Sequence, residues 1–289
     1  MIEEKFTAWL EDANERFRRE ELPPAHRPFR AFADYCEEHS CSLAYGSPIA
    51  DAIFAWFYKH SAPGSHQVGS LFTGAYYYDA FFWPVNIPIG YGRATLDVFN
   101  SLESMPDAIK RSLAKDKAEA DLPVLHWADC VDYGYGFDDI AQTTRLTERA
   151  LAFARNGDRE LIGAIRQILH PRPNLKSILG FRMAAEIFMK VVLVQERGLS
   201  DRELQKLGHS IERLAKECHA QTGMAEFAKV ARDAAAFPDV SDRYDGEEKT
   251  PREVWTAALV AQRAASAFAR KYSDRDMRAQ VVSSLRPDG

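Results

Sequence analysis

A chain of 289 residues is long enough for one large domain or two modest ones. Its hydrophobic share of 46% and charged share of 27% are those of a globular protein, which excludes the disordered and fibrous classes. A net charge of −5 argues against a protein that coats nucleic acid through bulk electrostatics, although it leaves room for a local basic patch.

The N-terminal quarter of the chain predicts helices. Residues 2–20 have the amphipathic spacing of a surface helix, and Ser47-Pro48 combines an N-cap with proline at the first helical position. The first residues lack a basic region followed by an apolar run, so we expect no signal peptide and a cytoplasmic protein. The four cysteines are too scattered for a disulfide framework. Cys36 and Cys41, with His39 between them, have the spacing of half a zinc site, but without a second pair we expect reduced thiols and no cofactor.

The next segment, Tyr76–Arg93, is dense in aromatic residues. Between Leu71 and Gly92 the only formal charge is Asp79, but glycines and prolines interrupt the run, so we do not expect a membrane span. Of this segment, residues 84–89 look extended, and the two prolines favour an irregular loop over a central strand. The aromatic run is either a core plug beside a turn or the wall of a ligand site. In the second interpretation the ligand-binding candidates are Tyr78, Asp79, Asn86 and Arg93.

A second cluster follows at His126–Asp139. His126, Asp129 and Asp132 repeat every three residues, so a helix would place them on one side, where they are metal-ligand candidates. We expect no metal, because the sequence has no Glu-x-x-His or His-Glu-x-x-His motif to complete such a site. Asp138 and Asp139 are interpreted as first-turn charges of a helix that runs to Asn156.

The rest of the chain is a series of helices. Gly157 is predicted to end one helix, and His170-Pro-Arg-Pro173 breaks the chain. The longest apolar helix then runs from about Asn174 to Glu196. Ser200–Glu203 and Thr250–Glu253 are capping boxes, the second opening an alanine-rich helix to about Tyr272, and residues 273–289 are expected to fray. We predict an all-α protein with an aromatic-rich helical region, 1–156, and a C-terminal up-and-down bundle, 157–289.

Three charged residues interrupt the apolar helix at i, i+4 spacing: Arg182, Glu186 and Lys190. They form one stripe, which is either a ladder of ion pairs or the lining of a groove. Glu186 and Lys190 are therefore further ligand-binding candidates.

At this helix the chain resembles a known family. Ala185-Glu186-Ile-Phe-Met-Lys190 is similar to the Ala-Glu-x-x-x-Lys signature of HEPN domains. Leu207-Gly-His-Ser-Ile-Glu-Arg-Leu214 resembles the turn that follows it in many members, and Arg243-Tyr244 is also similar. The resemblance covers at most residues 145–275. It implies a helical bundle that often pairs as a homodimer, in a prokaryotic toxin–antitoxin or phage-defence setting, with a protein, RNA or nucleotide partner.

The resemblance does not settle whether the chain is an enzyme. Catalytic HEPN ribonucleases carry Arg-x(4–6)-His late in the domain, where arginine stabilises charge and histidine moves protons. The closing helix here has no histidine, but two earlier pairs satisfy the spacing, Arg202 with His209 and Arg213 with His219. A binding function is the first hypothesis. An enzyme with a small-molecule or metal-dependent pocket between residues 76–93 and 126–139 is the alternative, and an immunity-type inhibitor is a third.

Overall fold

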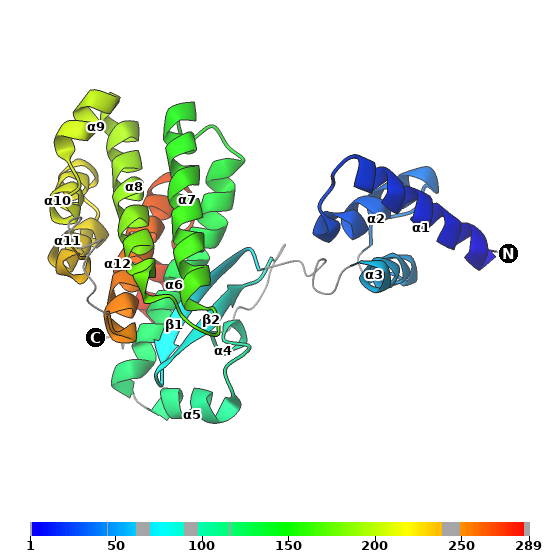
Figure 1. The fold of residues 1–289 in the computed structure, drawn as a ribbon, viewed down its shortest axis with the longest axis horizontal. Coiled ribbons are helices and arrows are strands. Elements are labelled where there is room, and N and C mark those ends of the chain that lie inside the picture. Colours follow the sequence, from blue (N-terminus) through cyan, green and yellow to red (C-terminus); the bar gives the residue numbers. More distant parts are fainter. Residues whose placement is uncertain are drawn as a thin grey trace. The chain divides into compact units, whose positions relative to one another are not determined.

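The computed structural model describes residues 2–44, 46–61, 70–89, 98–115, 117–238 and 249–285. Over these residues the chain forms 13 α-helices, three short 3-10 helices and one two-stranded sheet (Figure 1). The predicted all-α class is thus confirmed. None of the described helices combines the length and the apolar character that crossing a bilayer requires.

The chain divides into two compact units, Met1–Gly69 and Ser70–Gly289. The expected division at Asn156 is therefore corrected. That division assumed that a helix ends at Gly157. In the structure Gly157 is instead buried inside one continuous helix, α7 (Glu148–Ile168).

Three helices form the first unit. They are α1 (Ile2–Arg19), α2 (Arg27–Glu38) and α3 (Pro48–His60), with a 3-10 turn at Pro24–His26. The predicted cap of α3 is confirmed, because the Ser47 hydroxyl accepts a hydrogen bond from the Ala50 N–H at 3.3 Å. The helices enclose a small separate core of buried side chains: Leu10, Ala13, Phe17, Ala31, Phe32, Cys36, Ala50, Ile53 and Phe57.

The second unit begins with a β-hairpin that the sequence analysis did not predict. Strands β1 (Phe72–Tyr78) and β2 (Phe81–Ile87) pair antiparallel, and Asp79 and Ala80 both have positive φ, as a type I′ turn requires. Counting from this turn, the Ala75–Pro84 pair falls at a non-hydrogen-bonded position, so the proline removes no ladder hydrogen bond. For this reason Pro84 is compatible with a strand.

Helix α6 (Lys117–Ala141) follows two shorter helices, α4 (Val98–Ser101) and α5 (Asp107–Lys115). It continues through Asp138 and Asp139, which lie near its C-terminal end, so the expectation that they begin a helix is wrong. The glycines of α6 face close neighbours rather than ending the helix: a Cβ on Gly134 would lie 2.9 Å from the Phe72 Cβ. Close packing of the hairpin on α6 thus explains a glycine that looks like a helix breaker in the sequence.

In the second unit α8 (Ile178–Arg197) packs against both α7 and α12 (Pro251–Tyr272) (Figure 1). Helix α12 packs in turn on α6, and β1 lies against both α6 and α7. Twelve residues of α8 are buried, as expected for the spine of a bundle, although Met183 is 38% exposed. A 3-10 turn at Leu175–Ser177 leads into the helix, and Gly198 ends it in the left-handed conformation.

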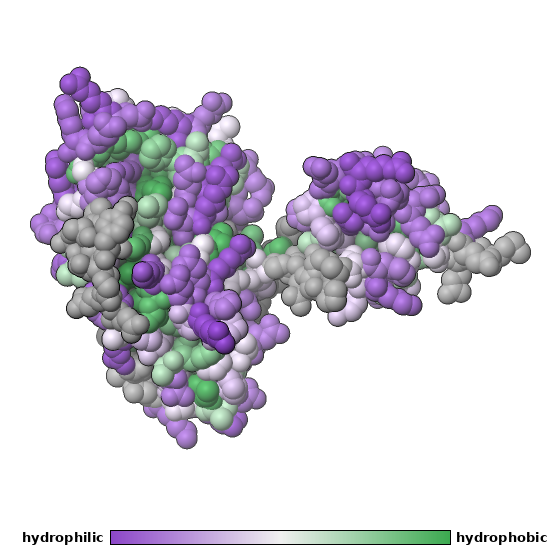
Figure 2. All heavy atoms as spheres, in the orientation of Figure 1, coloured by the Kyte–Doolittle hydropathy of each residue, from purple (hydrophilic) through white to green (hydrophobic). Residues whose placement is uncertain are grey.

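Three shorter helices follow α8. They are α9 (Asp201–Leu207), α10 (Ile211–Thr222) and α11 (Ala225–Arg232), followed by a 3-10 turn at Ala234–Ala236. Of these helices, α10 packs on α8, and α11 packs on α10 and α12. Both predicted capping boxes are confirmed, at Ser200 before α9 and at Thr250 before α12. Apolar side chains show between the hydrophilic outer surfaces of α7 and α10 (Figure 2).

Residues 273–285, the described part of the segment that was expected to fray, contain one more helix. Helix α13 (Met277–Leu285) packs on α6, and the Asp132 carboxylate accepts hydrogen bonds from the Met277 N–H at 2.5 Å and the Arg278 N–H at 3.1 Å. A buried side chain of α6 therefore acts as the N-terminal anchor of α13, which a local reading of the polar C-terminal residues could not reveal.

Candidate functional site

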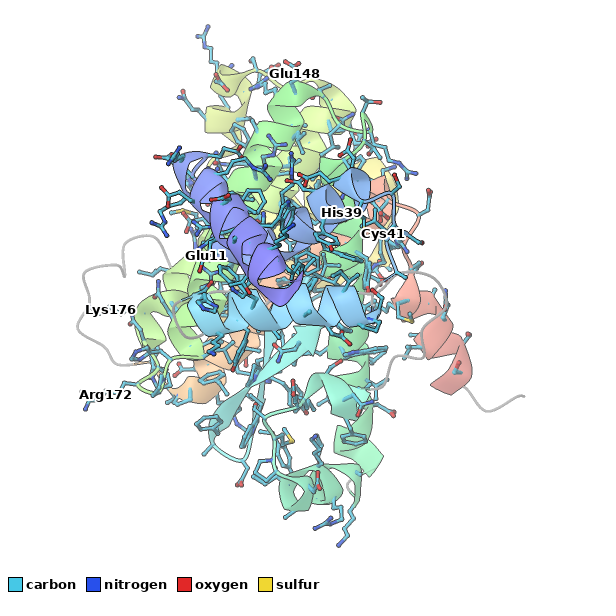
Figure 3. All side chains as sticks on the ribbon, turned by 90° about the vertical axis from the view of Figure 1, so that its right-hand side faces the viewer. Glu11, His39, Cys41, Glu148, Arg172 and Lys176 are labelled. Carbon is cyan, nitrogen blue, oxygen red and sulfur yellow. The ribbon has the colours of Figure 1, made fainter. Side chains whose placement is uncertain are left out.

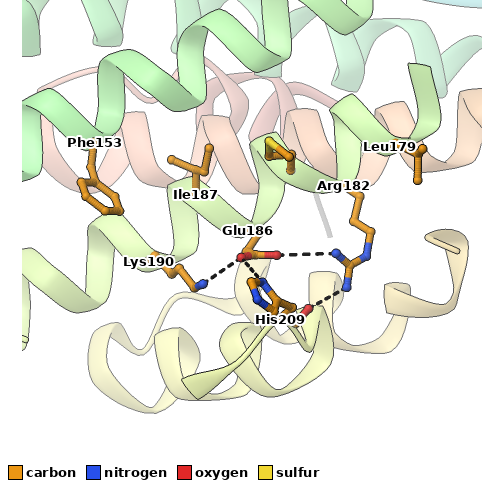
Figure 4. Close-up of a pocket in the computed structure, with 8 residues that line it drawn as sticks. Phe153, Leu179, Arg182, Glu186, Ile187, Lys190 and His209 are labelled. Carbon is orange, nitrogen blue, oxygen red and sulfur yellow. Dashed lines mark hydrogen bonds and ion pairs between the residues drawn. The ribbon is translucent and has the colours of Figure 1, made fainter. Parts of the chain in front are cut away.

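A pocket lies where α7, α8 and the connection between α9 and α10 meet (Figure 4). Its volume is about 260 Å³. Eight side chains line it, four of them apolar and four charged or titratable: Phe153, Leu179, Met183, Ile187, Arg182, Glu186, Lys190 and His209.

The Glu186 carboxylate is the centre of the polar half of this pocket. Lys190 Nζ donates to Glu186 Oε1 at 2.7 Å, and His209 Nδ1 lies 2.8 Å from the same oxygen. Arg182 Nη1 lies 3.5 Å from Glu186 Oε2. One carboxylate therefore holds three basic side chains, which Figure 4 shows converging on it.

Local sequence explains how these groups come together. The i, i+4 spacing of Arg182, Glu186 and Lys190 puts them on one face of α8, where Arg182 and Glu186 contact His209 in the connection between α9 and α10. Gly208 has a φ of 72° and ends α9, and the Ser210 hydroxyl caps α10. Between these two residues the chain presents His209, whose carbonyl oxygen accepts a 2.7 Å hydrogen bond from Arg182 Nη2.

The polar half of the pocket carries an excess of positive charge. Two cations, Arg182 and Lys190, face the single Glu186 carboxylate, so these three side chains carry a net charge of +1. The side chains of Arg182, Glu186 and Lys190 are nearly buried, so salt screens their fields less than it screens those of surface charges. This arrangement suits a ligand with an anionic group beside an apolar part.

In the structure the two histidines of the predicted arginine–histidine pairs contact other partners. His209 lies in the pocket, but the arginine that contacts it is Arg182 of α8. Arg202 is on the exposed side of α9. His219, the partner proposed for Arg213, lies near the end of α10 with Nδ1 2.9 Å from the Met224 carbonyl oxygen. Arg213 itself is exposed on α10.

The metal candidates on α6 have other partners. Arg270 Nη1 donates to Asp129 Oδ1 and to Asp132 Oδ2, both at 2.9 Å, and Arg278 Nη1 donates to Asp129 Oδ2 at 2.6 Å. His126 Nε2 lies 2.8 Å from the Ala75 carbonyl oxygen. Among the described residues, no group of three or more such side chains could hold a metal ion. The helical spacing thus reflects an ion network that joins α6 to α12 and α13.

Burial shifts the titration of two members of this cluster. It lowers the pKa of His126 to about 4, because the charged imidazolium would lose its hydration, and the nearby Asp129 carboxylate offsets part of that effect. Burial also raises the pKa of Asp132, partly offset by its hydrogen bonds from the Met277 N–H and Arg270. His126 is therefore a neutral, buried residue at physiological pH.

The aromatic candidates lie on the hairpin. The Tyr78 hydroxyl donates to Ser112 Oγ at 3.4 Å, Asp79 is exposed in the turn, and Asn86 Oδ1 accepts from Thr73 Oγ1 at 3.2 Å. Arg93 lies outside the described residues, as does the Arg243-Tyr244 pair. The described parts of the hairpin and α6 meet by direct contact: the Phe72 and Tyr133 rings are 4.9 Å apart, edge to face.

Of the residues singled out from the sequence, the structure brings Glu186, Lys190 and His209 into one pocket. Arg182 was recognised as part of the charged stripe but not as a site residue, and its i, i+4 spacing to Glu186 was the available signal. Nothing in the sequence marked Phe153 as a pocket residue, because its place in the pocket depends on how α7 packs on α8. Comparison with protein-family models, curated proteins and solved structures found no match for this chain.

Proposed function

We propose that this chain is a HEPN-like helical protein of a prokaryotic defence or toxin–antitoxin system, and that it binds a nucleotide or a short stretch of RNA in the α8 pocket. One observation carries the proposal. The two segments with the family resemblance, 185–190 and 207–214, are remote in sequence, yet the 2.8 Å contact between Glu186 and His209 joins them in one pocket.

The chemistry of the pocket supports a nucleotide over an uncharged ligand. Lys190 and Arg182 supply the charge that a phosphate group needs, and phosphate contacts dominate the affinity of proteins for nucleic acid. The apolar side of the pocket, with Phe153, Met183 and Ile187, offers a surface on which a base can pack. The volume of about 260 Å³ is close to the lower end of typical ligand pockets, which favours a single nucleotide unit.

Binding can be tested by fluorescence anisotropy with a labelled single-stranded RNA oligonucleotide and with nucleoside monophosphates as competitors. We expect Lys190→Met to weaken binding at least about tenfold and to reduce the salt dependence by about one phosphate contact. Lys216→Met is the matched control, because Lys216 forms a similar i, i+4 pair with Glu212 on the exposed face of α10. Equal affinities for the two variants would contradict the proposal.

A second candidate function is RNA cleavage at the same pocket. It is favoured by the position of His209: with its Nδ1 against Glu186, the other ring nitrogen is free to transfer protons to or from a bound substrate. The same oligonucleotide, incubated with the protein and separated by electrophoresis, tests this function. We then expect His209→Ala to abolish product formation while retaining most of the binding, and intact RNA with the unmodified protein would exclude cleavage of that oligonucleotide.

A further inference from the structure

The end of α2 brings two cysteines together through its capping geometry. Ser40 is left-handed, with a φ of 51°, and the Cys41 N–H donates to the Cys36 carbonyl oxygen at 2.9 Å. The Ser40 N–H also donates, over 3.4 Å, to the Glu37 carbonyl oxygen. These two bonds are the pair that defines a Schellman motif. In this motif the side chains of the two residues joined by the 6→1 bond, here Cys41 and Cys36, commonly touch. In this chain those two side chains are the thiols of Cys36 and Cys41.

The two sulfur atoms are 2.8 Å apart, closer than ordinary van der Waals contact between thiols, and both cysteines are free. They differ in access to solvent, since Cys36 is 3% exposed whereas Cys41 is on the surface beside His39 (Figure 3). In redox-sensor proteins the attacking cysteine is accessible to solvent and often lies next to a resolving cysteine.

We propose that Cys36 and Cys41 are a redox pair, which closes to an intramolecular disulfide when the protein meets a small-molecule disulfide oxidant. The Cys41 thiolate attacks one sulfur of the oxidant, a bond forms between them, and the oxidant's own S–S bond breaks to release one thiol. Cys36 then gives up its proton and attacks Cys41 Sγ, which releases the second thiol. Two protein thiols are oxidised and one oxidant molecule is reduced to two thiols.

The order of the two steps follows from the surroundings. Burial and the neighbouring Cys41 thiol raise the pKa of Cys36 to about 11, so Cys36 stays protonated until Cys41 has reacted. The other two cysteines, Cys130 and Cys218, are fully buried in the second unit and serve as internal controls. Burial raises the pKa of both of these thiols as well, which makes them poor nucleophiles.

Mass spectrometry of the full-length chain tests the pair. Cys36 and Cys41 fall on one tryptic peptide, Ala31–Lys59, because no lysine or arginine lies between Arg30 and Lys59. After incubation with oxidised glutathione, denaturation and alkylation, we expect this peptide to be unalkylated and lighter by two hydrogen atoms. Peptides with Cys130 and Cys218 should be alkylated, and dithiothreitol should restore both thiols of the Ala31–Lys59 peptide.

Single variants separate the two roles. In Cys36→Ser the reaction should stop at a stable glutathione adduct on Cys41, whereas Cys41→Ser should leave Cys36 alkylatable and without adduct. A stable adduct on Cys41 in the unmodified chain would overturn the proposal, as would two alkylatable thiols at an oxidant concentration that closes a reference dithiol. Both substitutions lie in the first unit, whereas the α8 pocket lies in the second, so the test is independent of the proposed function.

Discussion

Glu186 Oε1 and His209 Nδ1 lie 2.8 Å apart and tie the central helix α8 to the connection between α9 and α10. Together with the 2.7 Å bond from Arg182 Nη2 to the His209 carbonyl oxygen, this contact fixes both the ring and the backbone of His209. The pocket is thus held by polar contacts on one side and by the packing of α7 on α8 on the other.

The first prediction concerns the charge of Glu186. Its side chain and those of Arg182 and Lys190 are each about one-tenth exposed, so Glu186→Gln leaves two nearly buried cations without their carboxylate. We expect a loss of about 1–3 kcal/mol in the free energy of unfolding, measured by urea denaturation. Glu212→Gln, in the exposed pair with Lys216, should leave the stability almost unchanged. A change of the same size in both variants would mean that the Glu186 contacts do not stabilise the fold.

The second prediction is a pH dependence that arises from His126. Its folded-state pKa is about 4, below the unfolded value of about 6.5, so the unfolded chain binds the extra proton between these two values. Stability is therefore unaffected by His126 above pH 6.5 and falls as the pH drops from 6.5 towards 4. The full contribution is on the order of 3 kcal/mol.

This effect is measured as a difference between variants, because burial also raises the pKa values of Asp132 and Asp158, which add their own pH dependence to the stability. His126→Gln keeps a donor for the Ala75 carbonyl oxygen but cannot titrate. We expect the stability of the unmodified chain relative to His126→Gln to decline between pH 7 and pH 5. A constant difference over that range would show that His126 does not control acid stability.

The third prediction is that Asp132 anchors α13. It accepts hydrogen bonds from two backbone N–H groups of α13 and forms an ion pair with Arg270, and its side chain is 1% exposed. Asp132→Asn should cost about 3 kcal/mol, since it leaves a buried guanidinium with less compensation. It should also increase amide hydrogen exchange within 277–285. Asp274→Asn breaks an exposed pair with Arg145 and is the control, for which we expect little change in either measurement.

The parts of the fold that the sequence predicted are those with local signals. The caps at Ser47, Ser200 and Thr250 were recognised because the residues that make each cap lie within three positions of one another. The hairpin was missed because β1 has buried residues on consecutive positions, so the alternation that marks a half-exposed strand is absent.

The site was predictable in part for the same reason. Glu186 and Lys190 stood out as charges on an apolar helix. His209 stood out because residues 207–214 resemble the turn that follows this helix in many HEPN domains. Their meeting is a tertiary contact across 23 residues, which no local pattern contains. The carboxylates at Asp129 and Asp132 were recognised as a group on one helical side, but their arginine partners come from 270 and 278, far along the chain.

The last prediction compares two glycines of α7, one of which was mistaken for a helix end. A Cβ at Gly163 would meet no heavy atom within 4 Å, so Gly163→Ala should gain the helix propensity of alanine, about 0.5–1 kcal/mol. A Cβ at Gly157 would lie 3.1 Å from Ile187 Cγ2 and 3.2 Å from the Phe188 ring, tighter than ordinary contact. Because Phe188 is fully buried, it has little room to move, and overpacking of a core typically costs about 1–3 kcal/mol.

We therefore expect Gly157→Ala to lower the free energy of unfolding by about 1 kcal/mol, after the gain in helix propensity is counted. Urea denaturation of the two variants side by side measures both effects in the same helix. Stabilisation by both substitutions would indicate that α7 and α8 can separate slightly without penalty. Destabilisation by Gly157→Ala together with stabilisation by Gly163→Ala would establish that Gly157 is required for the close approach of α7 to α8, on which the Phe153 side of the pocket depends.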